Sequence, residues 1–161
     1  MEGMGSHQSA SMLKDEWLTP PEIIKQLGPF DLDPCAPINR PWPTAEKHYT
    51  INDNGLLQSW TGFVWCNPPY GLEAARWLER MAMHNHGIAL IFARTETKMF
   101  FDYVWGKAEA LMFFCGRLYF YHVDGTKAKA NAGAPSVLIA YGGEAKRRLY
   151  RSYISGHYVE L

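Results

Sequence analysis

The apolar positions of the chain change their spacing several times, and each spacing predicts an element. Continuous apolar runs at residues 63–66, 88–93 and 110–114 are typical of strands in a sheet that is covered on both faces. Residues 72–86 carry apolar side chains at helical spacing, and residues 97–105 predict a further helix. Gly87 stands where the C-cap of the first helix is expected. Strands and helices therefore alternate through the middle of the chain.

The N-terminal part is predicted from turn residues as well as from apolar positions. Residues 22–27 predict a short helix, with Thr19 as its N-cap and proline in its first turn. Residues 30–33 predict a brief strand. Residues 34–44 contain four prolines and predict a loop without a regular hydrogen-bonded ladder.

The C-terminal part predicts how the sheet is completed. Residues 117–122 and 136–141 are expected to form a terminal antiparallel strand pair around the loop 123–135, which is rich in glycine, alanine and lysine. Together the elements predict an α/β sheet with helices on both faces. We expect a flexible tail over residues 1–14 and a single domain over residues 15–161.

Composition and charge narrow the possible partners. The chain has 161 residues with 16 basic and 16 acidic side chains, so it has no overall positive field to attract nucleic acid. A nucleic-acid partner would have to be held by local basic patches. No apolar run approaches the roughly 20 residues that span a bilayer, and the start lacks the apolar core of a signal peptide.

The cysteines and histidines do not predict a metal site. Cys35, Cys66 and Cys115 are odd in number and lie in or beside apolar runs, which is typical of free thiols in a reducing, intracellular setting. The chain has no CxxC, no HExxH and no other paired spacing of metal ligands, and its six histidines are scattered. We therefore expect no metal.

Polar residues at the strand ends are the first candidates for function. Asp33, Asn67 and Arg94 each follow a predicted strand directly. Ligands of α/β sheets bind beyond the carboxyl ends of the strands, so these three positions are expected to border one site.

The tetrapeptide of Asn67, Pro68, Pro69 and Tyr70 has its own chemistry. A residue before proline is held extended, so the Asn67 carboxamide oxygen and the Pro68 carbonyl can both accept hydrogen bonds from one NH2 group. Tyr70 adds a flat face on which a planar ring can stack. This arrangement suits methylation of an exocyclic amine. The alternative is a rigid turn that caps a strand, with Tyr70 in the core.

Several motifs in order carry a family resemblance. The chain reads DEWLTPPEI, FDLDPCA, VWCNPPYG, ARTETKMFF, CGRLYF and APSVLIAYG between residues 15 and 142. This set resembles the (Asn/Asp)-Pro-Pro-(Tyr/Phe) amino-methyltransferases, and more closely the small phage-type DNA N6-adenine methyltransferases of the Dam family. The resemblance implies S-adenosylmethionine as cofactor, adenine in DNA as substrate and no separate target-recognition domain.

The resemblance also implies a fold and a location. The fold would be the Rossmann-like methyltransferase fold, with a mostly parallel sheet and a terminal antiparallel strand pair. The location would be the cytoplasm of a bacterial host, with a phage or prophage as the source of the gene. The segment between Asp33 and Asn67 is short for this fold, so one strand is expected to be missing or irregular.

The cofactor residues are taken from matching motifs. In FDLDPCA, Asp33 would pair with the ammonium group of the cofactor. The wider superfamily has Gly-x-Gly in this loop, where this chain has Ala36-Pro37, which leaves the details of the contact open. One acidic residue, for which Glu46 is a candidate, would bind the ribose. The remaining cofactor candidates are Thr19, Pro20, Pro34, Cys35, Ala36, Asp53 and Asn54.

The DNA contacts are expected from local groups. Adenine in a duplex must leave the base stack, and basic side chains must hold the phosphates. Lys127 and Lys129 in the loop 123–135, together with Arg94 and Arg117, are the candidates. A second basic cluster, Lys146, Arg147, Arg148 and Arg151, is a further candidate, although an ordinary solvated surface is the slightly better interpretation.

Other functions stay open. Cytosine N4 and the side-chain amide of a protein glutamine offer the same amine chemistry as adenine N6. A catalytically weak DNA-binding relic is the alternative from another class, because the loop after Asp33 departs from the usual pattern.

Overall fold

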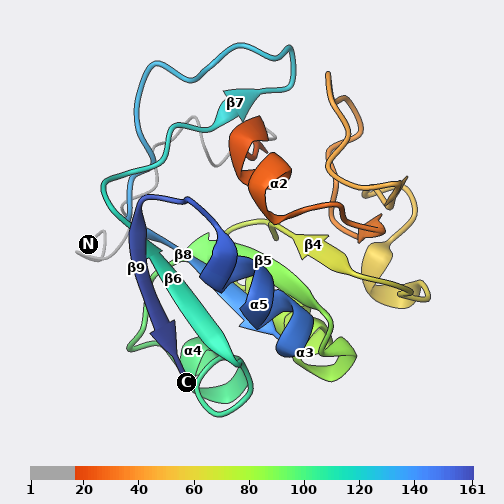
Figure 1. Cartoon of the computed structure of the whole chain (residues 1–161). Coiled ribbons are helices and arrows are strands. Elements are labelled where there is room, and N and C mark those ends of the chain that lie inside the picture. The colour runs from red at the N-terminus through yellow and green to blue at the C-terminus, as the bar shows by residue number, and fades with distance from the viewer. Residues whose placement is uncertain (1–16) are drawn as a thin grey trace, which may run out of the picture.

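The structure is a computed structural model that describes residues 17–161, and a seven-stranded sheet forms its centre (Figure 1). The tail predicted over residues 1–14 lies outside the described residues. The strand order across the sheet is β3 (Lys47–His48), β2 (Leu32–Asp33), β4 (Val64–Cys66), β5 (Gly87–Phe92), β8 (Ser136–Tyr141), β6 (Ala110–Phe114) and β9 (Gly156–Glu160).

The sheet is mixed. The pairs β3–β2, β2–β4 and β4–β5 are parallel, whereas β5–β8, β8–β6 and β6–β9 are antiparallel. The predicted α/β sheet is therefore confirmed, but half of its neighbouring pairs are antiparallel, so it is not mostly parallel. The reason is that β8 enters the sheet between β5 and β6 and runs against both.

The predicted terminal strand pair is wrong. Residues 117–122 do not pair with β8; only β7 (Tyr121–His122) is a strand, and it pairs antiparallel with β1 (Trp17–Leu18) in a separate two-stranded sheet. All six residues of β8 are buried, so this strand belongs in the interior of the large sheet. Such an apolar strand needs partners on both edges and helices on both faces.

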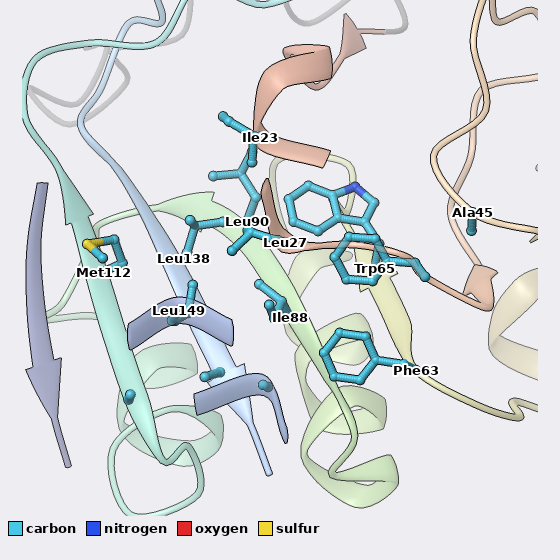
Figure 2. Close-up of a cluster of buried hydrophobic side chains, with 14 of the residues drawn as sticks. Ile23, Leu27, Ala45, Phe63, Trp65, Ile88, Leu90, Met112, Leu138 and Leu149 are labelled. Atoms are coloured by element: carbon cyan, nitrogen blue, oxygen red, sulfur yellow. The ribbon is translucent and has the colours of Figure 1, made fainter. Parts of the chain in front are cut away.

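Helices cover both faces of the sheet, as predicted. They are α2 (Pro21–Leu27), α3 (Ala74–His84), α4 (Lys98–Tyr103) and α5 (Gly143–Arg151), with a short 3-10 helix, η1 (Gly55–Leu57). In β5, Ile88 and Leu90 pack with α2 and α5, as Figure 2 shows, while Ala89 and Ile91 pack with α3 and α4. Neighbouring residues of a strand point to opposite faces, so a fully apolar strand serves two cores.

Several helix ends differ from the prediction. The C-cap of α3 is Asn85, in the left-handed region at φ 53°, and its N–H donates to the Met81 carbonyl. Gly87 instead begins β5, where a Cβ would lie 2.4 Å from the Val64 carbonyl oxygen. Helix α4 begins one residue after the predicted start, because Thr97 is its N-cap, and it ends at Tyr103 rather than at residue 105. Thr19 does not cap α2, because Pro20 occupies the N-cap position and no side chain caps this helix.

The C-terminal basic cluster is largely used within the fold. The sequence did not predict α5 or β9, and Lys146 pairs with Glu160 between these two elements. The Arg148 guanidinium donates to the Leu27 and Pro29 carbonyls, at 3.0 and 2.7 Å, and lies 3.9 Å from the Phe63 ring centroid. Arg148 therefore ties α5 to the end of α2.

We expect Arg148→Met to lower the free energy of unfolding by about 1–2 kcal/mol, because the charged hydrogen bonds to two carbonyls are lost while the length of the side chain is kept. Urea denaturation measures this change. The matched control is Arg147→Met, one residue earlier, whose guanidinium pairs with Glu144 on the exposed part of the helix. Equal effects of the two substitutions would contradict the assigned role of Arg148.

Candidate active site

The loops that follow β2 and β4 border one cleft. Both strands end at the same edge of the sheet, because they are parallel neighbours. The cleft has a volume of about 720 Å³, and its walls also include η1 and the start of α3. Of the residues predicted for catalysis or cofactor binding, Pro34, Cys35, Asn54, Asn67, Pro68, Pro69 and Tyr70 line it.

Asn67 presents an unused acceptor in this cleft. Its Nδ2 donates to Thr19 Oγ1 at 3.4 Å. Its Oδ1 is buried and has no hydrogen-bond partner among residues 17–161. A buried oxygen without a donor costs about 1–3 kcal/mol, so such atoms are rare unless a ligand supplies the missing hydrogen. The cleft therefore suits a ligand with an N–H or O–H group at Asn67.

Tyr70 is held flat against the end of β5. Its ring stacks on Phe92, with 4.1 Å between centroids and 7° between planes. Burial raises the pKa of the Tyr70 hydroxyl well above its usual value of 10, so the phenol stays neutral near pH 7. Tyr70 can offer an aromatic face but no base. The Arg94 guanidinium lies 5.8 Å from the Phe92 centroid, and Arg94, which was expected to border the site, does not line the cleft.

Asp33 is engaged inside the protein. Its side chain is only 3% exposed and does not line the cleft. The carboxylate accepts from the Cys35 N–H at 3.1 Å and from the Thr44 hydroxyl. Burial raises the pKa of Asp33 to about 6, although both hydrogen bonds act in the opposite direction. Asp33 fixes the shape of the loop, and its contact with a cofactor ammonium stays a prediction.

The loop of residues 34–37 has no backbone N–H left for a ligand. Pro34 and Pro37 carry none, the Cys35 N–H goes to Asp33, and the Ala36 N–H goes to the Tyr49 carbonyl at 2.9 Å. Where the wider superfamily has Gly-x-Gly, this chain thus has only carbonyl oxygens to offer a ligand, and the Pro37 carbonyl already accepts from Arg40 at 2.8 Å. A positively charged donor fits such a wall better than an anion does.

The wall formed by η1 is in close backbone contact with this loop. A Cβ on Gly55 would lie 2.0 Å from the Pro34 carbonyl oxygen, so only glycine allows the contact. Asn54 lines the cleft from the left-handed region at φ 54°. Asp53 and Glu46 do not line it, and the Asp53 carboxylate accepts from the Thr50 N–H at 2.8 Å.

Sequence reasoning missed the apolar lining of the cleft. Ile51 and Leu57 line it although they are 81% and 76% exposed, and Trp77 adds an aromatic side chain from α3. Isolated apolar residues in the polar stretch before residue 58 were the only signal in the sequence. Their exposure suggests a planar or apolar ligand group between them.

A second cleft adjoins the first. It has a volume of about 480 Å³, and Lys127, Lys129 and His122 lie along it. Trp17 lines both clefts. Two of the predicted DNA contacts thus lie next to the cleft of Asn67. Arg117 lines neither cleft and donates to the Ala132 carbonyl at 3.3 Å.

Among the described residues, no three His, Cys, Asp or Glu side chains form a group that could hold a metal ion. Within residues 17–161, no helix has the length and hydrophobicity needed to cross a bilayer. None of the three cysteines forms a disulfide bond within residues 17–161; Cys66 is buried and Cys35 half-buried, but Cys115 is exposed.

Comparison with protein families gives one match. The family described as DNA N-6-adenine-methyltransferase (Dam) matches residues 6–159. No curated protein and no solved structure matches.

The raised pKa of Asp33 predicts how stability depends on pH. The pKa rises from 3.8 to about 6 on folding, so between these values the unfolded chain binds fewer protons than the folded one. The Asp33 titration should therefore lower the free energy of unfolding by about 3 kcal/mol as pH rises through this window. Burial lowers the pKa of His48 to about 4, which acts in the opposite direction over nearly the same range. Asp33→Asn removes the Asp33 titration alone, so its free energy of unfolding should rise with pH relative to that of the unsubstituted protein. Urea denaturation of both proteins at pH 4 to 7 measures this difference. Parallel curves of the free energy of unfolding against pH would contradict the raised pKa of Asp33.

Proposed function

We propose that this chain, which belongs to the DNA N-6-adenine-methyltransferase (Dam) family, transfers a methyl group from S-adenosylmethionine to the N6 amine of adenine in DNA. The single observation that carries the proposal is the buried Asn67 Oδ1, an acceptor without a partner in the cleft. The exocyclic amine of adenine supplies the missing hydrogen.

The protein contributes position rather than covalent chemistry. The two hydrogens of the amine go to Asn67 Oδ1 and to the Pro68 carbonyl, which turns the nitrogen lone pair out of conjugation with the ring. Tyr70, braced by Phe92, stacks on the adenine. Because Tyr70 is a neutral phenol, it takes no proton, and the proton that leaves the methylated amine passes to water. Orientation of this kind supplies much of an enzyme's rate.

The first cleft fits the cofactor. It combines apolar and aromatic walls with a few polar groups, as small-molecule sites do. S-adenosylmethionine supplies an electrophilic methyl group on its sulfonium. Ile51, Leu57 and Asn54 would hold its planar and polar ring groups. Pro34 and Cys35 would hold its ammonium through the acceptor-only loop, with Asp33 and Ala36 shaping that loop from behind. Thr19, Pro20, Ala36 and Asp53 do not line this cleft, and their contacts with the cofactor stay predictions.

The second cleft fits the DNA strand beside the target base. Its lysines, Lys127 and Lys129, are exposed and can neutralise phosphates, whereas the net charge of the chain is zero. The Arg94 guanidinium lies near Phe92, on which Tyr70 stacks, and Arg117 donates to the Ala132 carbonyl in the same loop as the lysines. Extrusion of the adenine costs a few kcal/mol, which stacking and hydrogen bonds in the first cleft offset.

The order of strands supports a methyltransferase sheet of the Rossmann type. Strands β2, β4 and β5 run parallel and deliver the loops of the first cleft, and β8 runs against them. Only one short strand, β3, lies beyond β2. This matches the expectation that one strand is missing in the short segment between Asp33 and Asn67.

We expect Asn67→Ala to lower kcat by about 10²–10³-fold, because one of the two fixed acceptors for the amine is lost. Tyr70→Ala should lower activity less, by about tenfold, because stacking contributes roughly 1–3 kcal/mol per base. Tyr70→Phe keeps the ring and is the matched control. Transfer of labelled methyl groups to adenine-containing duplex DNA, followed by nucleoside analysis, measures all three variants.

The same assay separates the alternatives. Labelled methyl groups found on cytosine or on a protein glutamine would identify that group, and not adenine, as the acceptor. No transfer by the unsubstituted protein, or undiminished transfer after Asn67→Ala, would contradict the proposal. A protein that fails to bind S-adenosylmethionine in calorimetry, with or without DNA, would be the DNA-binding relic.

The contact between Gly55 and Pro34 predicts a second effect on the cofactor. Gly55→Ala forces the two walls of the cleft apart, because the new Cβ would meet the Pro34 carbonyl. We expect the affinity for S-adenosylmethionine to fall about tenfold or more, which corresponds to about 1.4 kcal/mol. Calorimetry measures this affinity. Gly143→Ala is the control, because nothing lies within 4 Å of a Cβ there. Equal affinities of the two variants would contradict the assignment of the cleft.

A further inference from the structure

We infer that Thr19 is a positioning residue for the reaction: its hydroxyl accepts from the NH2 end of the Asn67 carboxamide, so that the oxygen end is left for the substrate amine. The inference rests on the proposed function, because it concerns the transfer at Asn67.

The Thr19 hydroxyl is available for this task. Thr19 is only 3% exposed and lies between β1 and α2. Its side chain does not cap α2, although its sequence position predicted a cap. Instead Oγ1 accepts from Asn67 Nδ2 across 48 residues of chain. A buried threonine hydroxyl needs a polar partner, and Asn67 supplies it.

The orientation of the Asn67 carboxamide matters because its oxygen and its NH2 group are similar in size, but the oxygen accepts hydrogen bonds and the NH2 group donates them. With NH2 toward Thr19, Oδ1 can accept from the amine. With NH2 toward the cleft, two NH2 groups would face each other and neither could accept. Removal of the Thr19 hydroxyl would take away the hydrogen bond that holds the carboxamide in the orientation seen in the structure, so Asn67 would no longer be fixed with its oxygen available to the amine.

The backbone of Thr19 is fixed by the two-stranded sheet. Trp17 and Leu18 pair with His122 and Tyr121, and the Trp17 and His122 rings lie 4.7 Å apart. Figure 1 shows β7 close to α2, the helix that begins just after Thr19. The turn after β7 leads to Lys127 in the second cleft. The strand pair that holds Thr19 therefore also carries the loop proposed to hold DNA.

The first experiment replaces Thr19 by valine, which keeps the shape and removes the hydroxyl. We expect kcat to fall about 10- to 100-fold, because small losses of orientation have effects of this size. The KM for DNA and the calorimetric affinity for S-adenosylmethionine should change little. Thr19→Ser keeps the hydroxyl and should restore kcat. If Thr19 instead binds the cofactor, the affinity falls and kcat at saturating cofactor is retained, which overturns the inference.

The second experiment repeats the substitution in an Asn67→Asp background. A carboxylate has two equivalent oxygens and no NH2, so it can accept from the substrate amine in either orientation. Thr19→Val should therefore lower kcat less in this background than beside Asn67. An equal loss in both backgrounds would show that Thr19 acts on packing alone and would overturn the inference.

A third measurement does not depend on activity. In nitrogen-edited NMR spectra, the side-chain NH2 signals of Asn67 are identified by their loss in Asn67→Asp. These signals should shift in Thr19→Val and stay near their positions in Thr19→Ser. Unchanged signals in Thr19→Val would overturn the contact even if the protein transfers no methyl group. Failure of this inference is therefore distinguishable from failure of the proposed function. If Thr19→Val does not fold, Thr19→Ala removes the same hydroxyl and serves in its place.

Discussion

The burial of β5 and β8 on both faces is the constraint on which the rest of the structure depends. These two strands pair over six residues each, from Gly87 opposite Tyr141 to Phe92 opposite Ser136, and all of these residues are buried. Each strand must have a hydrogen-bonded partner on both edges and an apolar layer on both faces. Helices α2 and α5 provide one layer, and α3 and α4 provide the other. Polar chemistry is thereby confined to the strand ends, where the loops that border the first cleft begin.

Two polar side chains at neighbouring strand ends differ in how far the fold satisfies their hydrogen bonds. Asp33 is buried with donors on both carboxylate oxygens, and it maintains the loop that it begins. Asn67 has a partner for its nitrogen and none for its oxygen. A fold gains nothing from leaving a buried oxygen unsatisfied, so the cost is best explained by a ligand that removes it. The same residue types in a sequence motif do not reveal this difference; the hydrogen-bond partners do.

The sequence predicted most elements of the fold but not how the sheet is completed. Apolar spacing located β4, β5, β6, β8, α3 and α4 to within a few residues, because each buries a continuous face. It could not show that β8 inserts between β5 and β6, since the pairing of a strand depends on contacts across the whole chain. Helix α5 was not predicted, and its basic residues were considered only as a DNA contact or a solvated surface, because a list of charges does not show the packing and hydrogen bonds of Arg148.

The candidate site was predictable where one motif contains it and unpredictable where distant segments meet. Asn67, Pro68, Pro69 and Tyr70 line the cleft as neighbours in sequence. The contacts of Thr19 with Asn67 and of Gly55 with Pro34 join segments 48 and 21 residues apart, and no local pattern marks them. One contact holds the Asn67 carboxamide, and the other joins η1 to the loop after β2. The sequence therefore located the motif of the site but not the contacts between distant segments that fix its geometry.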